Sequence, residues 1–206
     1  MKNKKIKVAI TGNIGSGKST FSSFLSEKGY PVINADDVSK EILSTDKEVR
    51  KKVISEFGEQ SFSGAKINTI YIAERVFQDK KKLQILNSIL HPLVIKNIEQ
   101  RFDELHQNND IVFCETALLF EAKMKKMFDY SVLIFADYNV RESRFLKGKG
   151  NSSEQFINRN ENQIKDENKI NNSDFVFNNN GTEKDLKRKS EILLLSLNSL
   201  IGHRHN

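Results

Sequence analysis

Five short apolar runs alternate along the chain with longer stretches whose apolar positions repeat every three or four residues. The runs contain many β-branched or aromatic residues and lack strict polar alternation, as strands covered on both faces do. They occupy residues 6–11, 31–34, 111–114, 130–136 and 175–177. Strands that alternate with helices predict an α/β fold with a five-stranded parallel sheet.

The stretches between the runs place apolar residues on one face of a helix. The clearest examples are Phe21, Phe24 and Leu25; Val49, Val53 and Phe57; Ile95, Ile98, Phe102 and Leu105; and Leu186, Leu193, Leu197 and Leu200. The first set follows the first strand directly and the last set closes the chain. Each set predicts a helix that packs one side against the rest of the protein.

Two intervals do not fit simple strand–helix alternation. Residues 37–109 are nearly all helical in pattern and are too long for one crossover, which predicts a helical insertion. Residues 139–170 are so polar that they pack thinly, which predicts a segment that moves as a lid. The remainder, residues 1–36, 110–138 and 171–206, forms the predicted core.

Composition excludes several classes of protein and indicates where in the cell this protein is located. The chain has 206 residues, with 33 Lys and Arg against 27 Asp and Glu, and a formal charge of +6. No apolar run approaches the roughly 18 residues of a membrane span, and the apolar run at 6–10 is too short for a signal peptide. The single Cys114 excludes an internal disulfide, and it is expected to be a buried strand residue. We therefore expect a cytoplasmic protein that binds no membrane.

The positive charge is scattered among several clusters beside acidic or polar residues, which favours solvated helix faces over a nucleic-acid groove. We expect no nucleic-acid partner, and no obligate protein partner is evident from the sequence. A mildly positive surface also suits a small polyanion such as a nucleotide. The terminal His203-Arg204-His205 is expected to be solvated.

A phosphate-binding motif follows the first predicted strand. It runs Gly12-Asn13-Ile14-Gly15-Ser16-Gly17-Lys18-Ser19-Thr20 and matches G-x-x-x-x-G-K-[ST] between a strand and an amphipathic helix. The glycines let consecutive N–H groups turn toward phosphates, and the helix start adds its positive dipole end. Lys18 is expected to bridge the β- and γ-phosphates of ATP, Ser19 to bind Mg²⁺ and Thr20 to reach the α-phosphate.

Other features of the chain separate the reaction classes that share this motif. A GTPase needs D-x-x-G, which does not occur, and the sequence Asn168-Lys169-Ile170-Asn171 lacks the aspartate that closes a guanine motif. An ATP-dependent motor is usually longer and has a strand ending in Asp-Glu, which Cys114-Glu115 only approximates. A small kinase remains, in which an insertion binds the acceptor and a lid closes over ATP.

Asp36 follows the second predicted strand, and ligands gather at the carboxyl ends of strands in an open α/β sheet. A carboxylate there can accept the proton of an alcohol acceptor. Alternatively, Asp36 or Asp37 is the N-cap of the next helix. The residues alone do not separate these two roles.

Several motifs together resemble the dephospho-coenzyme A kinase family. They are the phosphate loop, Val32-Ile33-Asn34-Ala35-Asp36, Leu90-His91-Pro92-Leu93, Ala117-Leu118-Leu119-Phe120-Glu121, Gln163 and Asn179-Asn180-Gly181. They occur in the family's order over residues 8–181. The resemblance implies a P-loop core, a helical acceptor domain and a lid. It also implies transfer of the γ-phosphate of ATP, with Mg²⁺, to the ribose 3′-hydroxyl of dephospho-coenzyme A.

The resemblance also implies roles for individual residues. Asp36 becomes the base, while Asn34 stands where the family has another aspartate and Ala117 where it has proline. Arg144 matches the first lid arginine and is expected to act on the transferred phosphate, and Gly148 lies near the position of a second. Asn180 is expected at the adenine edge. The residues expected to bind the acceptor are Asp36, His91, Leu118, Glu121, Arg159 and Gln163.

Structural roles compete with several of these assignments. In the alternative for His91, the residue fixes a helix break before Pro92 through a buried hydrogen bond. In the alternative for Glu121, the carboxylate pairs with Lys123 or Lys125. Arg141 is available as a lid cation but is expected to be a solvated helix charge, and the same alternative holds for Arg144 and Arg159. The alternative for Asn179-Asn180-Gly181 is a plain turn, because Asn-Gly favours turns. Competing functions are another small-molecule kinase, of the nucleoside monophosphate or shikimate type, and a non-catalytic ATP-binding protein.

Overall fold

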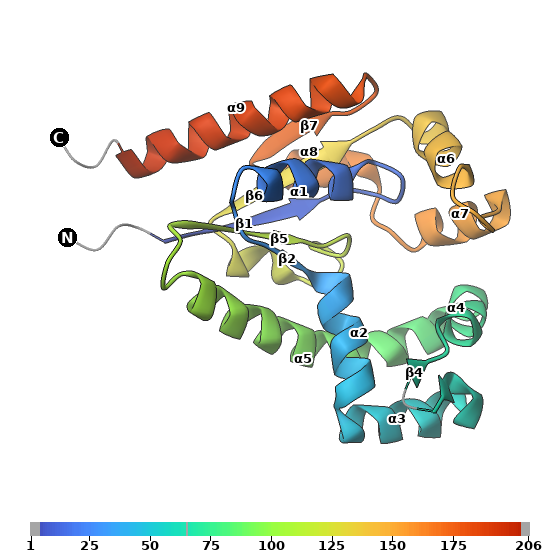
Figure 1. Ribbon diagram of the computed structural model, residues 1–206. Coiled ribbons are helices and arrows are strands. Elements are labelled where there is room, and N and C mark those ends of the chain that lie inside the picture. The colour runs from blue at the N-terminus through green and yellow to red at the C-terminus, as the bar shows by residue number, and fades with distance from the viewer. Residues whose placement is uncertain (1–4, 65, 203–206) are drawn as a thin grey trace. The chain divides into compact units, whose positions relative to one another are not determined.

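The computed structural model describes residues 5–64 and 66–202 (Figure 1). The predicted solvation of His203–His205 therefore lies outside the described residues. The chain forms two compact units. The first comprises Met1–Ile33 and Phe102–Asn206, and the second comprises Asn34–Arg101.

A five-stranded parallel sheet is the centre of the first unit. Its strands are β1 (Ile6–Thr11), β2 (Val32–Asn34), β5 (Ile111–Glu115), β6 (Tyr130–Phe135) and β7 (Phe175–Asn178). Their order across the sheet is β2-β5-β1-β6-β7. The predicted fold class is confirmed, and each predicted strand is present with its ends displaced by one residue at most.

The three central strands are almost completely buried, which explains their uninterrupted apolar sequences. Ile10 is paired with Glu115 of β5 and with Val132 of β6, so the carboxyl ends of these strands lie at one edge. The phosphate motif leaves the sheet at this edge, directly after Thr11. The fold therefore places the motif where open α/β sheets bind ligands.

Helices cover the sheet of the first unit. The bounds of these helices are α1 (Lys18–Glu27), η2 (Met124–Met127), α6 (Tyr138–Leu146), α7 (Ser153–Glu161), α8 (Asp166–Asn172) and α9 (Glu183–Gly202). Helices α1 and α9 lie side by side (Figure 1), and Phe21, Leu25, Leu193 and Leu197 of these helices join one buried core with the strands. The amphipathic patterns of these two helices predicted their buried faces.

The second unit is mainly helical. Its elements are α2 (Ala35–Thr45), α3 (Lys47–Phe57), η1 (Glu59–Ser61), β3 (Phe62–Ser63), β4 (Lys66–Ile67), α4 (Thr69–Gln78) and most of α5 (Lys80–Leu105). The antiparallel pair β3–β4 was not predicted. The predicted helix break before Pro92 is wrong, because α5 continues through Pro92.

The division into functional domains stays a prediction. The compact unit Asn34–Arg101 approximates the predicted insertion 37–109, and residues 139–170 belong to the first unit. Among the described residues, no helix combines the length and the apolar character needed to cross a membrane.

Candidate functional site

The phosphate loop has a backbone that only glycine adopts easily. Gly17 has a φ of 95° and directly precedes α1, and a Cβ atom there would lie 2.3 Å from Nδ2 of Asn179. No side-chain hydrogen bond caps the start of α1 in the described part of the chain. The first N–H groups of this helix are therefore available to an anion, to which the helix dipole adds attraction.

Buried polar atoms without a partner occur just before and within this loop and on α6. Among the described residues, Oγ1 of Thr11, Oδ1 of Asn13, Oγ of Ser16 and Nη1 of Arg144 are buried and make no hydrogen bond. An unsatisfied buried polar group is costly, so such groups need an explanation. The hydroxyl groups of Thr11 and Ser16 and the Nη1 group of Arg144 are donors, which suit an anionic ligand such as a nucleotide phosphate chain. Oδ1 of Asn13 is an acceptor and needs a donor instead.

Ser19 and Glu115 make the best candidate magnesium site. Oγ of Ser19 donates a hydrogen bond of 2.7 Å to Oε1 of Glu115, which ends β5 and is 8% exposed. No group of three or more His, Cys, Asp or Glu side chains suited to a metal occurs among the described residues. Mg²⁺ in phosphate sites needs only one or two protein ligands, because the substrate and waters supply the others. These residues therefore fit Mg²⁺ bound together with ATP.

Glu115 was not assigned a role from the sequence. The available signal was its place at the end of a buried strand, where P-loop proteins often carry an acidic residue. The pair Cys114-Glu115 matched that pattern only approximately, and the contact with Ser19 spans 96 positions of sequence. Cys114 itself is fully buried, as predicted.

Asn34, rather than Asp36 or Asp37, is the N-cap of α2. Its Oδ1 accepts hydrogen bonds from the backbone N–H groups of Asp36, at 2.9 Å, and Asp37, at 3.2 Å. The predicted alternative that an aspartate caps this helix is therefore wrong. Both aspartates lie exposed in the first turn of α2, and Asp37 forms an ion pair with Lys40 at 2.9 Å. The carboxylate of Asp36 is not used by the cap.

Gln163 contacts the phosphate loop directly. Its Oε1 accepts a 2.8 Å hydrogen bond from the N–H of Ile14. This contact was not predicted, because Gln163 was expected to bind the acceptor. The side chain also carries an amide NH₂ group, so an acceptor contact stays a prediction.

Arg141 is buried, and its prediction as a solvated helix charge is wrong. The residue is 3% exposed and its guanidinium forms an ion pair of 3.1 Å with Asp166. Burial raises the pKa of the Asp166 carboxyl group, while the positive charges of Arg141 and Lys169 oppose that rise. The sequence alone did not reveal this pair, because α7 and the turn after it separate the two residues.

The other two arginines of this region lie nearer the surface. Arg144 belongs to α6, and its Nη1 is one of the buried atoms without a partner described above. The guanidinium of Arg159 in α7 lies 5.5 Å from the ring centre of Phe145. Phosphate binding by Arg144 and acceptor binding by Arg159 stay predictions.

Glu121 forms a buried ion pair with Lys169. The two side chains approach to 2.9 Å, and Lys169 is completely buried. Oε1 of Glu121 also accepts a 2.8 Å hydrogen bond from the N–H of Ile164, while Nζ of Lys169 donates to the carbonyl of Ala117. The predicted pairing with Lys123 or Lys125 is therefore wrong. Oε2 of Glu121 is buried without a partner in the described part of the chain, so an acceptor contact is still open to it.

Leu118 lies in the turn that follows β5. Its N–H donates a 3.3 Å hydrogen bond to Oγ1 of Thr116, and its carbonyl accepts one from Ala122. The side chain is half-buried. Both backbone groups of Leu118 are therefore fixed by the turn. The contact of the Leu118 side chain with the acceptor stays a prediction.

Asn179 and Asn180 follow β7 and hold different backbone groups. Nδ2 of Asn179 donates a 2.8 Å hydrogen bond to the carbonyl of Ser16 in the phosphate loop. Oδ1 of Asn180 accepts a 2.9 Å hydrogen bond from the N–H of Asp137. The contact of Asn179 with the loop was not predicted. The Asn-Asn-Gly sequence signalled a functional turn but not which asparagine reaches the loop.

His91 lies in the second unit, within α5. Its imidazole makes no hydrogen bond among the described residues, so the predicted buried hydrogen bond at a helix break is wrong. Burial lowers the pKa of the imidazole from its ordinary value of 6.5. The group is therefore held mainly in its neutral form near neutral pH, and acceptor binding stays a prediction.

The lowered pKa of His91 predicts a loss of stability in acid. The unfolded chain protonates this histidine below about pH 6.5, whereas the folded chain resists protonation. The free energy of unfolding should therefore fall as the pH drops from that value through the lower folded pKa. Urea unfolding of the His91→Gln variant should show a smaller fall over this range. Equal losses in the variant and the original chain would contradict the prediction.

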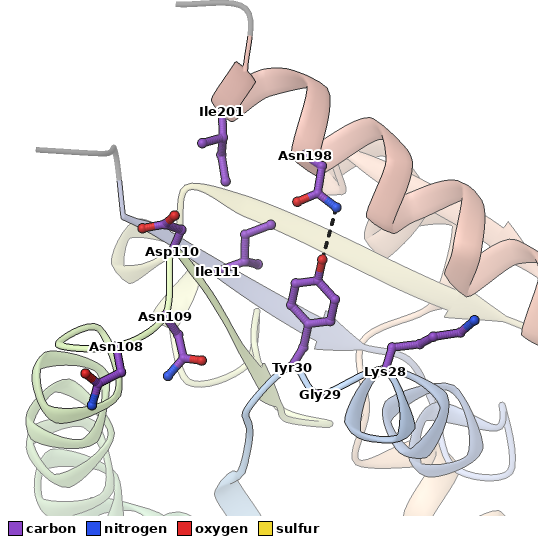
Figure 2. Close-up of a pocket in the computed structure, with 9 residues that line it drawn as sticks. All are labelled: Lys28, Gly29, Tyr30, Asn108, Asn109, Asp110, Ile111, Asn198 and Ile201. Atoms are coloured by element: carbon purple, nitrogen blue, oxygen red, sulfur yellow. Dashed lines mark hydrogen bonds between the residues drawn. The ribbon is translucent and has the colours of Figure 1, made fainter. Parts of the chain in front are cut away.

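Two of the cavities in the described part of the first unit are relevant to the location of the site. One of about 370 Å³ lies beside the phosphate loop, with Asn13, Arg141 and Asp166 in its wall. The other, of about 450 Å³, is shown in Figure 2 and lies at the amino-terminal edge of the sheet, beside Ile111. A hydrogen bond of 3.0 Å joins Asn198 to the hydroxyl of Tyr30 in that cavity (Figure 2). Only the first cavity lies at the edge where the phosphate loop leaves the sheet.

Comparison with known proteins identifies the family. The profile of dephospho-CoA kinase matches residues 6–185. A dephospho-CoA kinase from Chlamydia pneumoniae is 35% identical over 190 residues, which cover 91% of this chain and 94% of that protein. The crystal structure of a Thermus thermophilus protein has a TM-score of 0.78 and 30% identity, covering 94% of this chain and 98% of the other. A dephospho-CoA kinase structure from Campylobacter jejuni shares the fold, with a TM-score of 0.69, 24% identity and coverage of 93% and 96%. With its phosphate loop at the carboxyl edge of a parallel sheet, this chain belongs to the dephospho-CoA kinase family.

Proposed function

We propose that this chain transfers the γ-phosphoryl group of ATP to the 3′-hydroxyl of the ribose of dephospho-CoA, giving ADP and CoA. The observation that carries the proposal is the phosphate loop at the uncapped start of α1, in a chain that matches the family over most of its length. The reaction forms a bond between the 3′-oxygen and the γ-phosphorus. It breaks the bond between that phosphorus and the oxygen bridging to the β-phosphate.

The residues of the loop bind ATP in this proposal. The N–H groups of Gly15 and of Gly17 to Thr20 face the phosphates, and the ammonium of Lys18 neutralises charge on the β- and γ-phosphates. Ser19 and Glu115 hold Mg²⁺ with ATP, and the bound ion supplies further neutralisation of phosphate charge. Arg144 donates to the transferred group from α6. Asn180 contacts the adenine edge.

Asp36 accepts the proton of the 3′-hydroxyl. Its support is its position after the carboxyl end of β2, its match to the family pattern, and a carboxylate that the helix cap does not use. His91, Leu118, Glu121, Arg159 and Gln163 contact the acceptor. Asn34 cannot take up a proton at neutral pH, so a single carboxylate serves as the base.

An acceptor panel tests the proposed function. The purified chain is incubated with ATP and Mg²⁺ and, separately, with dephospho-CoA, AMP, shikimate or gluconate, and the formation of ADP is followed. We expect rapid ADP formation only in the incubation that contains dephospho-CoA. Faster turnover with another acceptor would assign a different small-molecule kinase. ATP binding without turnover on any acceptor would indicate a non-catalytic ATP-binding protein.

The contact between Ser19 and Glu115 predicts a change in magnesium dependence. In the Glu115→Gln variant, the Mg²⁺ concentration for half-maximal activity should rise at least about tenfold, because Glu115 holds Mg²⁺ with Ser19 and even the loss of a residue that only orients a ligand lowers metal affinity about tenfold. The measurement is a magnesium titration at saturating ATP and dephospho-CoA. The Glu191→Gln variant is a control, because Glu191 pairs with Lys28 on the surface at 3.2 Å. An unchanged titration in Glu115→Gln would remove Glu115 from the metal site.

A further inference from the structure

Arg141 joins four separate parts of the first unit. Its Nε donates a 3.0 Å hydrogen bond to the carbonyl of Ala136 at the end of β6. Its Nη1 donates to the carbonyl of Ile14 at 3.3 Å and to Oδ1 of Asn160 at 2.8 Å. Its Nη2 donates to Oδ2 of Asp166 at 3.1 Å. Since each of its three nitrogens is bonded within the protein and the side chain is 3% exposed, Arg141 is not placed to bind a phosphate.

Asp166 connects this arginine to a second residue of the phosphate loop. While its Oδ2 accepts from Arg141, its Oδ1 accepts a 2.7 Å hydrogen bond from Nδ2 of Asn13. The same amide group of Asn13 lies 3.3 Å from the carbonyl of Ile164. One carboxylate therefore fixes both the buried arginine and the first variable residue of the loop.

Both backbone groups of Ile14 are also held. Its carbonyl accepts from Arg141 and its N–H donates to Gln163. Gly15 follows with a φ of 76°, and a Cβ atom there would lie 2.3 Å from the carbonyl oxygen of Arg141. The tip of the loop thus packs on the backbone of α6 and is hydrogen-bonded to the side chain of Arg141.

All of these contacts are made by the protein's own groups, so the loop is held by neighbouring segments of the first unit. Binding energy is lost when a ligand must first order the segment that grips it, so a segment ordered in advance binds more tightly. Three glycines with positive φ would otherwise give this loop many alternative conformations. We propose that Arg141, through its ion pair with the half-buried Asp166, is a positioning residue that orders the phosphate loop for ATP. The inference rests on the proposed function, but it concerns ATP binding and not the acceptor.

The test compares ATP affinity with stability and with acceptor kinetics. Calorimetry with Mg²⁺ and a non-hydrolysable ATP analogue should show binding about tenfold weaker in Arg141→Gln than in the original chain. The KM for ATP should rise similarly, while the KM for dephospho-CoA stays within about twofold. Arg141→Lys should not restore affinity, because an ammonium cannot reproduce the forked contacts of a guanidinium. Arg188→Gln, on the exposed surface of α9, removes the same charge and should bind the analogue normally.

A second variant covers the case in which Arg141→Gln does not fold. Asn13→Ala removes the hydrogen bond to Asp166 and leaves the ion pair between Arg141 and Asp166 in place. It should weaken analogue binding several-fold with a smaller change in Tm. A folded Arg141→Gln or Asn13→Ala variant with analogue affinity within about twofold of the original chain would overturn the inference. So would equal rises in both KM values. If the original chain binds the analogue but transfers no phosphate, the proposed function fails and the positioning role is still tested by calorimetry.

Discussion

Lys18→Ala should lower kcat/KM for the kinase reaction by at least about a hundredfold, because it removes a fixed positive charge from phosphates that gain charge in the transition state. The ammonium of Lys18 lies 3.4 Å from the carbonyl of Asn13, so it already folds over the loop. The measurement is ADP formation with dephospho-CoA at several ATP concentrations. The thermal midpoint should change little, because the side chain is only half-buried.

Lys28→Ala is the matched control for this variant. Lys28 lies at the other end of the same helix and pairs with Glu191 on the surface. Its replacement removes an equal charge from α1 and should leave kcat/KM nearly unchanged. Activity of Lys18→Ala within a few-fold of the control would contradict the role of the lysine in transfer.

Asp36→Asn should lower kcat about a hundredfold or more and leave the affinity for ATP nearly unchanged. A general base typically contributes a factor of about 10² to 10⁴, and asparagine cannot accept the proton. The structure favours this test because Asn34, and not Asp36, caps α2. A fall in kcat would therefore not be explained by a lost helix cap. The measurements are kcat at saturating substrates and calorimetry with an ATP analogue.

Asp37→Asn provides the comparison at the neighbouring position. Asp37 is also exposed in the first turn of α2, and its carboxylate pairs with Lys40. Its replacement should change kcat by less than about threefold, since surface ion pairs contribute little. If Asp37→Asn is the inactive variant and Asp36→Asn is active, the base is Asp37. If both variants are fully active, neither aspartate is the base.

The strands and the phosphate loop were predictable because each is encoded locally. A run such as 130–135 is apolar on both faces, and only a covered strand needs that pattern. The loop is defined by nine adjacent residues between a strand and a helix. Elements with few residues were not predictable: β3 and β4 contain two residues each, too few to show alternation.

The continuous helix through Pro92 shows where a local rule fails. Proline removes one hydrogen bond of a helix and usually marks a break. Here Leu90, Val94, Ile98 and Phe102 repeat every four residues across the proline and are all buried. Burial of this stripe outweighs the lost hydrogen bond, and a local rule does not include that tertiary contribution.

The site was predictable only in part for a related reason. Lys18 and Ser19 are recognised by a motif, but the contact of Ser19 with Glu115 and the contacts of Arg141 with Ile14 and Asp166 join distant segments. From the sequence alone, an arginine in a polar stretch is indistinguishable from a charged residue on the surface. Only the folded arrangement shows that its partners surround it.

The most direct test of the central claim is the identity of the phosphorylated product. The purified chain is incubated with Mg²⁺, dephospho-CoA and ATP labelled in the γ-phosphate, and the product is examined by mass spectrometry and phosphorus NMR. The account predicts one labelled phosphate on the 3′-oxygen of the ribose, formed in equal amount to ADP. Label found only as inorganic phosphate, or on another oxygen of the acceptor, would contradict it.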